Sequence, residues 1–206
     1  MTYHVFGGSG SVGVIRLTEF NSTTPEQFKN AVSKLKDDGC DRFVFDLRNN
    51  GGGELNSILE VLDYLLPEGP IAHIYYRTGK ERHYTSDAAC LEARVAVLTN
   101  GRTASAAELF TSALRDYTRH GDYDAVLVGT KTYGKGVLQS FYKLKDGSAF
   151  KISTGKYNPP YSENYDGIGI TPDIVIELSE EAASVGFYKL TDENDNQLIA
   201  AVNAIK

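Results

Sequence analysis

Short strand-like runs and longer helical stripes of apolar residues follow one another along the chain. Runs of apolar and β-branched residues predict strands over residues 12–18, 42–47, 71–77, 94–99, 125–129, 137–144, 149–154 and 174–178. Apolar residues at helical spacing predict helices over residues 24–38, 55–66, 104–117 and 195–205. Strand and helix alternate through the first two-thirds, which predicts an α/β fold with a mainly parallel sheet flanked by helices. Residues 137–154 add a β-hairpin extension around a Lys145-Asp146-Gly147 turn.

The first predicted helix has clear signals at both ends. Thr24 is the expected N-cap, Pro25 suits the first helical position, and Gln27 is expected to complete a capping box with Thr24. Gly39 supplies the stop. Neither a linker nor an internal repeat interrupts the chain, so residues 1–206 are expected to form a single domain.

Composition narrows the possible partners. Among 206 residues, 21 Lys and Arg face 27 Asp and Glu, which gives a formal net charge of −6, and no basic run offers a footprint for nucleic acid. Apolar stretches stay short of the roughly 18 residues that a membrane span requires. No signal peptide is visible at the N-terminus. Two cysteines cannot form a disulfide framework, and no Cys/His spacing resembles a zinc site.

Two predicted strand-to-helix turns carry candidate chemistry, because sites in open α/β sheets lie at the carboxyl ends of strands. Gly51-Gly52-Gly53 follows one strand, and its backbone N–H groups can approach an anion closely, although a plain turn is an equally good interpretation. Ser105 follows another strand among small residues. A serine there is usually an N-cap, with Glu108 completing the capping box, but its hydroxyl also suits a nucleophile at a tight turn.

A serine nucleophile needs a base, and none of the four histidines lies in a glycine-rich turn. Lys135 does, between Gly134 and Gly136. A desolvated lysine can act as a general base, whereas a solvated surface cation is the usual alternative. The segment lacks the spacing of a phosphate-binding loop.

Three segments in this order resemble the C-terminal-processing (tail-specific) serine peptidases, which have a Ser-Lys catalytic centre. Residues 46–53 (DLRNNGGG) are similar to the family's DLRxNxGG signature, with Gly51 where proline is common. Residues 100–108 (NGRTASAAE) are similar to the nucleophile segment. Residues 128–139 (VGTKTYGKGVLQ) contain the G-K-G-x-x-Q pattern of the base segment. The resemblance spans about residues 12–178 and implies a core like those of ClpP and crotonase.

This resemblance assigns a role to each matching residue. Ser105 would be the nucleophile, Lys135 the general base and Gln139 the residue that orients the lysine, with oxyanion-hole amides from Ala106 and from either Gly52 or Gly53. It implies no metal or cofactor, an unstructured polypeptide substrate bound as an extended strand, and an extracytoplasmic location, and it leaves the oligomeric state open. The Cys40–Cys90 pairing also stays open.

Two departures from the family pattern stand out. Relatives usually carry a PDZ domain, for which this chain has no room, and the Ser105–Lys135 spacing is a few residues wider than usual. We expect the additional residues to lie in a polar loop at residues 118–124.

Two alternative functions remain: a non-catalytic peptide- or lipid-binding module on the same fold, and a crotonase-like acyl-handling enzyme, for which no acidic residue is clearly placed.

Overall fold

The computed structural model describes residues 1–8 and 10–206. Its main sheet has six strands in the order β1-β2-β3-β6-β7-β10, and all neighbours run parallel except the antiparallel pair β1–β2. The strands are β1 (Thr2–Val5), β2 (Val12–Arg16), β3 (Arg42–Asp46), β6 (Arg94–Thr99), β7 (Ala125–Gly129) and β10 (Ile174–Val175). The predicted α/β class with a mainly parallel sheet is confirmed.

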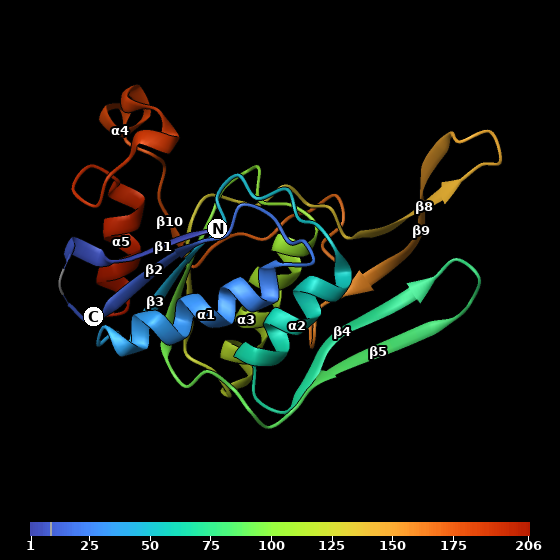
Figure 1. Cartoon of the computed structure of the whole chain (residues 1–206), viewed down its shortest axis with the longest axis horizontal. Coiled ribbons are helices and arrows are strands. Elements are labelled where there is room, and N and C mark those ends of the chain that lie inside the picture. The colour runs from blue at the N-terminus through green and yellow to red at the C-terminus, as the bar shows by residue number, and fades with distance from the viewer. Residues whose placement is uncertain (9) are drawn as a thin grey trace.

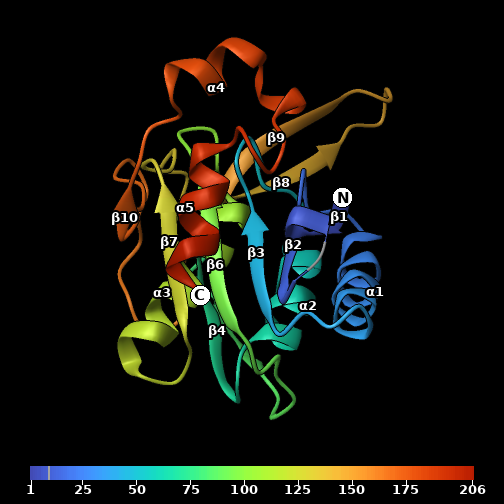
Figure 2. The same cartoon turned by 90° about the vertical axis from the view of Figure 1, so that its left-hand side faces the viewer.

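Helices cover both faces of this sheet (Figures 1 and 2). Three helices pack on one face: α1 (Thr24–Asp37), α2 (Leu55–Leu65) and α3 (Ala106–His120). On the opposite face lies α5 (Asn196–Ala204), preceded by the short α4 (Glu180–Val185). Successive side chains of β3 point to opposite faces of the sheet. Phe43 and Phe45 pack against the three-helix layer, whereas Val44 packs against α5.

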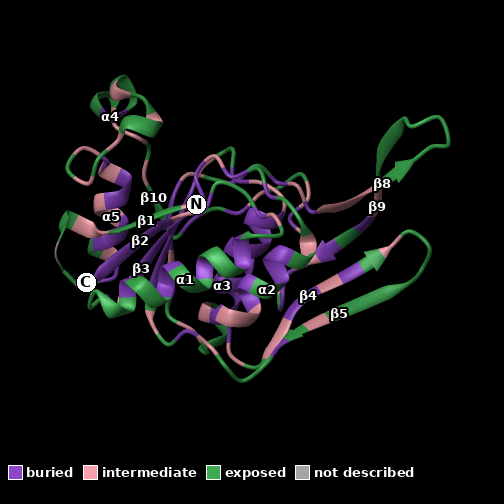
Figure 3. Cartoon of the chain, viewed as in Figure 1, coloured by how far each residue is buried: buried purple, intermediate pink, exposed green. Residues whose placement is uncertain are grey.

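A second, antiparallel sheet has the strand order β5-β4-β9-β8. It consists of β4 (Gly69–Tyr76), β5 (Glu81–Ser86), β8 (Val137–Lys143) and β9 (Ala149–Asn158). Figure 1 shows two hairpins, β4–β5 and β8–β9, extending from the body on the same side, and Figure 3 shows that their far ends are exposed. The predicted hairpin extension over residues 137–154 is thus confirmed as half of a larger sheet.

Several predicted boundaries are corrected. The segment 71–77 is a strand, but it belongs to the second sheet. Strands β1 and β5 were not predicted. The β5 sequence, ERHYTS, has no run of apolar residues, because most of this strand is exposed to solvent. The helix predicted from residue 104 begins at Ala106 and continues to His120, so the expected loop at 118–124 is reduced to residues 121–124.

The predicted capping box at the start of α1 is wrong. Thr23 is the N-cap, and Thr24 is already helical. The Thr24 hydroxyl accepts a hydrogen bond from the Asn21 N–H at 3.0 Å, outside the helix, so it does not cap the first turn. Pro25 does lie in the first turn, and Gly39 follows the last turn with φ +92° as predicted.

A buried ionic cluster joins the end of β3 to the start of α5. Arg48 is 2% exposed and donates to both oxygens of Asp46 and of Asp195, at 2.6–2.9 Å. The ring of Phe187 packs against the guanidinium of Arg48 at 4.9 Å, on the segment before α5. The C-terminal segment is therefore attached directly to the strand that leads into the glycine loop.

Candidate active site

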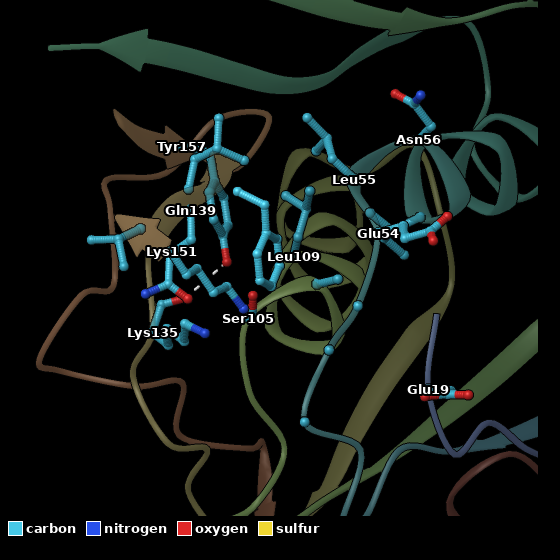
Figure 4. Close-up of a pocket in the computed structure, with 18 of the residues that line it drawn as sticks. Glu19, Glu54, Leu55, Asn56, Ser105, Leu109, Lys135, Gln139, Lys151 and Tyr157 are labelled. Atoms are coloured by element: carbon cyan, nitrogen blue, oxygen red, sulfur yellow. Dashed lines mark hydrogen bonds between the residues drawn. The ribbon is translucent and has the colours of Figure 1, made fainter. Parts of the chain in front are cut away.

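A cavity of about 740 Å³ opens where the carboxyl ends of β3 and β6 meet the second sheet. Its lining includes all six residues that the sequence singled out: Gly52, Gly53, Ser105, Ala106, Lys135 and Gln139. Figure 4 shows Lys135, Gln139 and Tyr157 lying together beside Ser105, with Glu54, Leu55 and Asn56 across the pocket. Residues more than 80 positions apart in sequence are thus brought into one pocket.

Ser105 occupies a tight turn between β6 and α3. Its φ of +58° and ψ of −120° make it one of two non-glycine residues with positive φ among those described. Such a conformation is costly for a residue with a Cβ, and it persists only where surrounding contacts impose it. One such contact is the buried Thr103 hydroxyl, which donates to the Leu47 carbonyl at 2.8 Å. The turn presents the serine side chain to the pocket, as a nucleophile elbow does.

Glu108 is a fully buried carboxylate that joins the serine turn to the lysine segment. One oxygen accepts from the Thr132 hydroxyl and the Gly134 N–H, both at 2.6 Å. The other accepts from the Ser105 N–H at 2.9 Å and the Lys135 N–H at 2.7 Å. The expected capping contact to Ser105 is confirmed. The three contacts to residues 132–135 were missed, because they depend on a loop 24 to 27 positions further along the chain.

The glycine loop packs directly against the serine turn. A Cβ on Gly52, whose φ is +100°, would lie 2.7 Å from the Ser105 Cβ and 2.9 Å from the Ala106 nitrogen. The Gly52 N–H donates to the Asn50 side-chain oxygen at 2.9 Å. Gly53 and Phe20 form a parallel β-bridge, in which the Phe20 N–H donates to the Gly52 carbonyl and the Glu54 N–H donates to the Phe20 carbonyl. The Gly53 N–H therefore points away from Phe20.

Two buried tyrosines support the backbone on either side of the pocket. The Tyr157 hydroxyl donates to the Lys135 carbonyl at 2.8 Å, and the Tyr165 hydroxyl donates to the Ser105 carbonyl at 3.4 Å. Their rings pack edge to face at 5.9 Å. Burial raises the pKa of Tyr157 to about 12, while the side chains of Tyr165 and Ser105 act in the opposite direction. Burial also raises the pKa of Tyr165, so both phenols are neutral hydrogen-bond donors at physiological pH.

The four histidines lie away from the pocket lining. His73 and His83 contact each other at 2.7 Å across β4 and β5, and His120 contacts Asp122 at 2.6 Å. Among the described residues, no group of three or more His, Cys, Asp and Glu side chains is arranged to hold a metal ion. Two lysines line the same pocket as Ser105: Lys135, from the glycine-rich turn, and Lys151 of β9.

Two further observations concern the rest of the chain. Cys40 and Cys90 are both free thiols, so the pairing left open by the sequence does not occur in this structure. Within residues 1–8 and 10–206, none of the helices combines the length and the apolar character needed to cross a bilayer.

Several known proteins with similar sequences or structures are named as processing proteases or peptidases. The carboxyl-terminal-processing protease of Synechocystis sp. is 35% identical over 196 residues, covering 95% of this chain and 44% of that protein. Carboxyl-terminal-processing peptidase 1, chloroplastic, of Arabidopsis thaliana is 41% identical over 174 residues, covering 82% and 34% respectively. The structure of a photosystem II D1 C-terminal processing protease superimposes with a TM-score of 0.71 at 32% identity, over 81% of this chain and 42% of that one.

These matches show how much of each relative the chain covers and to which family the chain belongs. The chain spans less than half the length of each of these three relatives. The model of Peptidase family S41 matches residues 11–176, a range that contains all six predicted site residues. The chain therefore belongs to peptidase family S41, together with the carboxyl-terminal-processing serine proteases that its motifs resemble.

Proposed function

We propose that this chain is the peptidase core of a carboxyl-terminal-processing protease and hydrolyses peptide bonds through a Ser105–Lys135 acyl-enzyme mechanism. One observation carries the proposal: both residues line a single cavity, and Glu108 binds the backbone N–H of each. Residues 1–206 act in this proposal as one catalytic domain.

In the first step, the neutral amine of Lys135 accepts the proton of the Ser105 hydroxyl as the oxygen attacks the substrate carbonyl. The new C–O bond gives a tetrahedral oxyanion. Lys135, now an ammonium, gives its proton to the nitrogen of the breaking peptide bond. The amine product leaves, and the acyl group remains on Ser105.

Two backbone amides are assigned to stabilise the oxyanion. Ala106 follows the nucleophile directly and lines the pocket. Of the two candidate glycines, Gly53 is favoured, because the Gly52 N–H already donates to Asn50. Gly52 has a different role in this scheme: it allows the loop to approach the serine turn closely.

In the second step, a water molecule gives its proton to Lys135 and attacks the acyl carbon. The tetrahedral intermediate collapses when the lysine returns that proton to the Ser105 oxygen, which releases the product as a carboxylic acid that then loses its proton to solvent. Gln139 stands on β8 at the pocket wall beside Lys135, and we assign it the orientation of the lysine amine.

An unstructured polypeptide tail is the proposed substrate. Strand β8 is an edge of the second sheet, and its residues 137–139 line the pocket, so an extended chain has a free edge to pair with. Main-chain pairing accepts varied sequences. By likeness to the relatives, we also propose an extracytoplasmic site of action.

Cleavage of unfolded casein by the wild type, Ser105→Ala and Lys135→Ala tests the mechanism. We expect cleavage by the wild type and none by either variant, while all three melt at similar temperatures. Cleavage by Ser105→Ala would disprove the assignment. Tight peptide binding by a wild type that never cleaves would instead support a non-catalytic binding module.

A further inference from the structure

The far end of the β8–β9 hairpin exposes an unusual amount of apolar surface. Residues 141–152, called here the hairpin tip, are all exposed. Within these twelve positions lie five large apolar side chains: Phe141 (71% exposed), Tyr142 (47%), Leu144 (50%), Phe150 (46%) and Ile152 (47%). Soluble proteins scatter such residues singly, whereas a contiguous group marks a surface that contacts something else.

Strand register divides these side chains between two faces. Tyr142 pairs with Phe150 and Ser140 with Ile152, so Tyr142, Phe150 and Ile152 share one face, called the outer face. The rings of Tyr142 and Phe150 stack at 5.3 Å. A groove of about 380 Å³ separates this face from residues 76–78 at the end of β4.

The opposite face of the tip belongs to the active-site pocket. Phe141 pairs with Lys151 across the strands, and both line the 740 Å³ cavity. The apolar surface of the tip therefore extends around the hairpin, from the wall of the pocket to the outer face. A protein groove would cover one face of such a hairpin, whereas a bilayer interface can surround its end.

Positive charge accompanies the apolar side chains. Lys143, Lys145 and Lys151 lie in the tip against a single acidic residue, Asp146, although the whole chain has a formal net charge of −6. Arg77 borders the outer-face groove. Within the described residues, none of these four cations forms an ion pair. Lysine heads on long apolar stems beside aromatic rings suit the interface of an anionic membrane.

From these observations we propose that the hairpin tip docks on an anionic lipid bilayer. The outer face and Leu144 enter the headgroup region, and Lys143 and Lys145 contact lipid phosphates. Because Phe141 and Lys151 connect the tip to the pocket wall, docking places the pocket beside the membrane surface. The proposal goes beyond the peptidase function and does not depend on it.

Sedimentation with lipid vesicles tests the docking without any activity measurement. We expect the wild-type chain to bind vesicles of phosphatidylcholine mixed with phosphatidylglycerol, and to bind pure phosphatidylcholine at least tenfold less. Tyr142→Ser with Phe150→Ser, and separately Lys143→Gln with Lys145→Gln, should each weaken binding to the mixed vesicles about tenfold or more.

Matched controls stand elsewhere on the surface. Tyr188→Ser is the control for the aromatic variant, because Tyr188 is 78% exposed on the C-terminal segment. Lys34→Gln with Lys36→Gln is the control for the lysine variant, because both lysines are exposed on α1. Neither control should change binding. The proposal is overturned if the wild type ignores anionic vesicles, or if tip and control variants bind alike. It is equally overturned if, without lipid, the wild type dimerises and Tyr142→Ser with Phe150→Ser does not, because the tip would then bind a second copy.

Discussion

Replacing Glu108 by glutamine tests whether this carboxylate holds the serine turn and the lysine segment together. The amide nitrogen of glutamine must face either the Gly134 N–H or both the Ser105 and Lys135 N–H groups, so at least one buried donor loses its acceptor. The Thr132 hydroxyl can adapt, because it can accept as well as donate. An unsatisfied buried donor and the loss of charge-assisted bonds together cost about 2–4 kcal/mol.

If that loss displaces the lysine segment, kcat for peptide hydrolysis falls by about 30-fold to about 1,000-fold, since each 1.36 kcal/mol corresponds to tenfold in rate. Urea unfolding of the same variant should show a loss of similar size. KM should change little, because Glu108 lies beneath the pocket and is absent from its lining. The assay is cleavage of a fluorescent peptide at several substrate concentrations, combined with the urea titration.

Asp116→Asn is the matched control on the same helix. Asp116 is also buried, and one of its oxygens accepts from the Tyr161 and Ser162 N–H groups at 3.1 and 2.8 Å, away from the pocket. Its amide variant should lose comparable stability and keep its kcat. The positioning role of Glu108 is refuted if Glu108→Gln retains wild-type kcat, or if both variants lose kcat equally.

Three further outcomes follow from the geometry. Tyr157→Phe loses one hydrogen bond, worth about 0.5–1.5 kcal/mol, so kcat should fall about two- to tenfold; a fall below 1% of wild type would mean that the phenol does more than position the backbone. Gly52→Ala, with its Cβ 2.7 Å from the Ser105 Cβ and φ at +100°, should abolish turnover, whereas Gly51→Ala meets nothing within 4 Å and should remain active in the same peptide assay. Burial alone would raise the pKa of Asp46, but the neighbouring arginines outweigh it and hold this pKa below its ordinary value of 3.8. Its stabilising contribution is therefore complete above that value and is lost as the pH falls through the lower folded-state pKa, so acid titration of the unfolding free energy should show a shallower slope for Asp46→Asn; equal slopes would contradict this.

Local patterns were enough to predict the fold class and the position of Ser105. Small residues after an apolar strand indicated a strand-to-helix turn, and the structure places Ser105 at φ +58° in that turn. Gly39 and Pro25 likewise act within a few positions of themselves. Information of this kind is contained in short stretches of sequence, since it depends on backbone conformation and on helix ends.

Features that depend on distant partners could not be predicted. The bonds of Glu108 to residues 132–135 exist only after β7 brings that loop beside α3. Tyr157 resembled any other packing tyrosine until its hydroxyl met the Lys135 carbonyl. Strand β5 is polar and exposed, and it is a strand because β4 offers a free edge, which its own residues do not signal.

The Arg48 cluster has a consequence for how the chain matures during synthesis. Asp195 supplies one of the two carboxylates around this buried guanidinium, yet it lies 147 positions further along the sequence. A nascent chain that stops before α5 leaves the arginine only partly paired, and a buried charge without its partner is strongly destabilising. Because Asp46 and Arg48 immediately precede the glycine loop, that loop gains its full support only after translation of the C-terminal segment. A truncated copy that ends before α5 is therefore expected to lack a fully supported glycine loop, and with it the proposed peptidase activity.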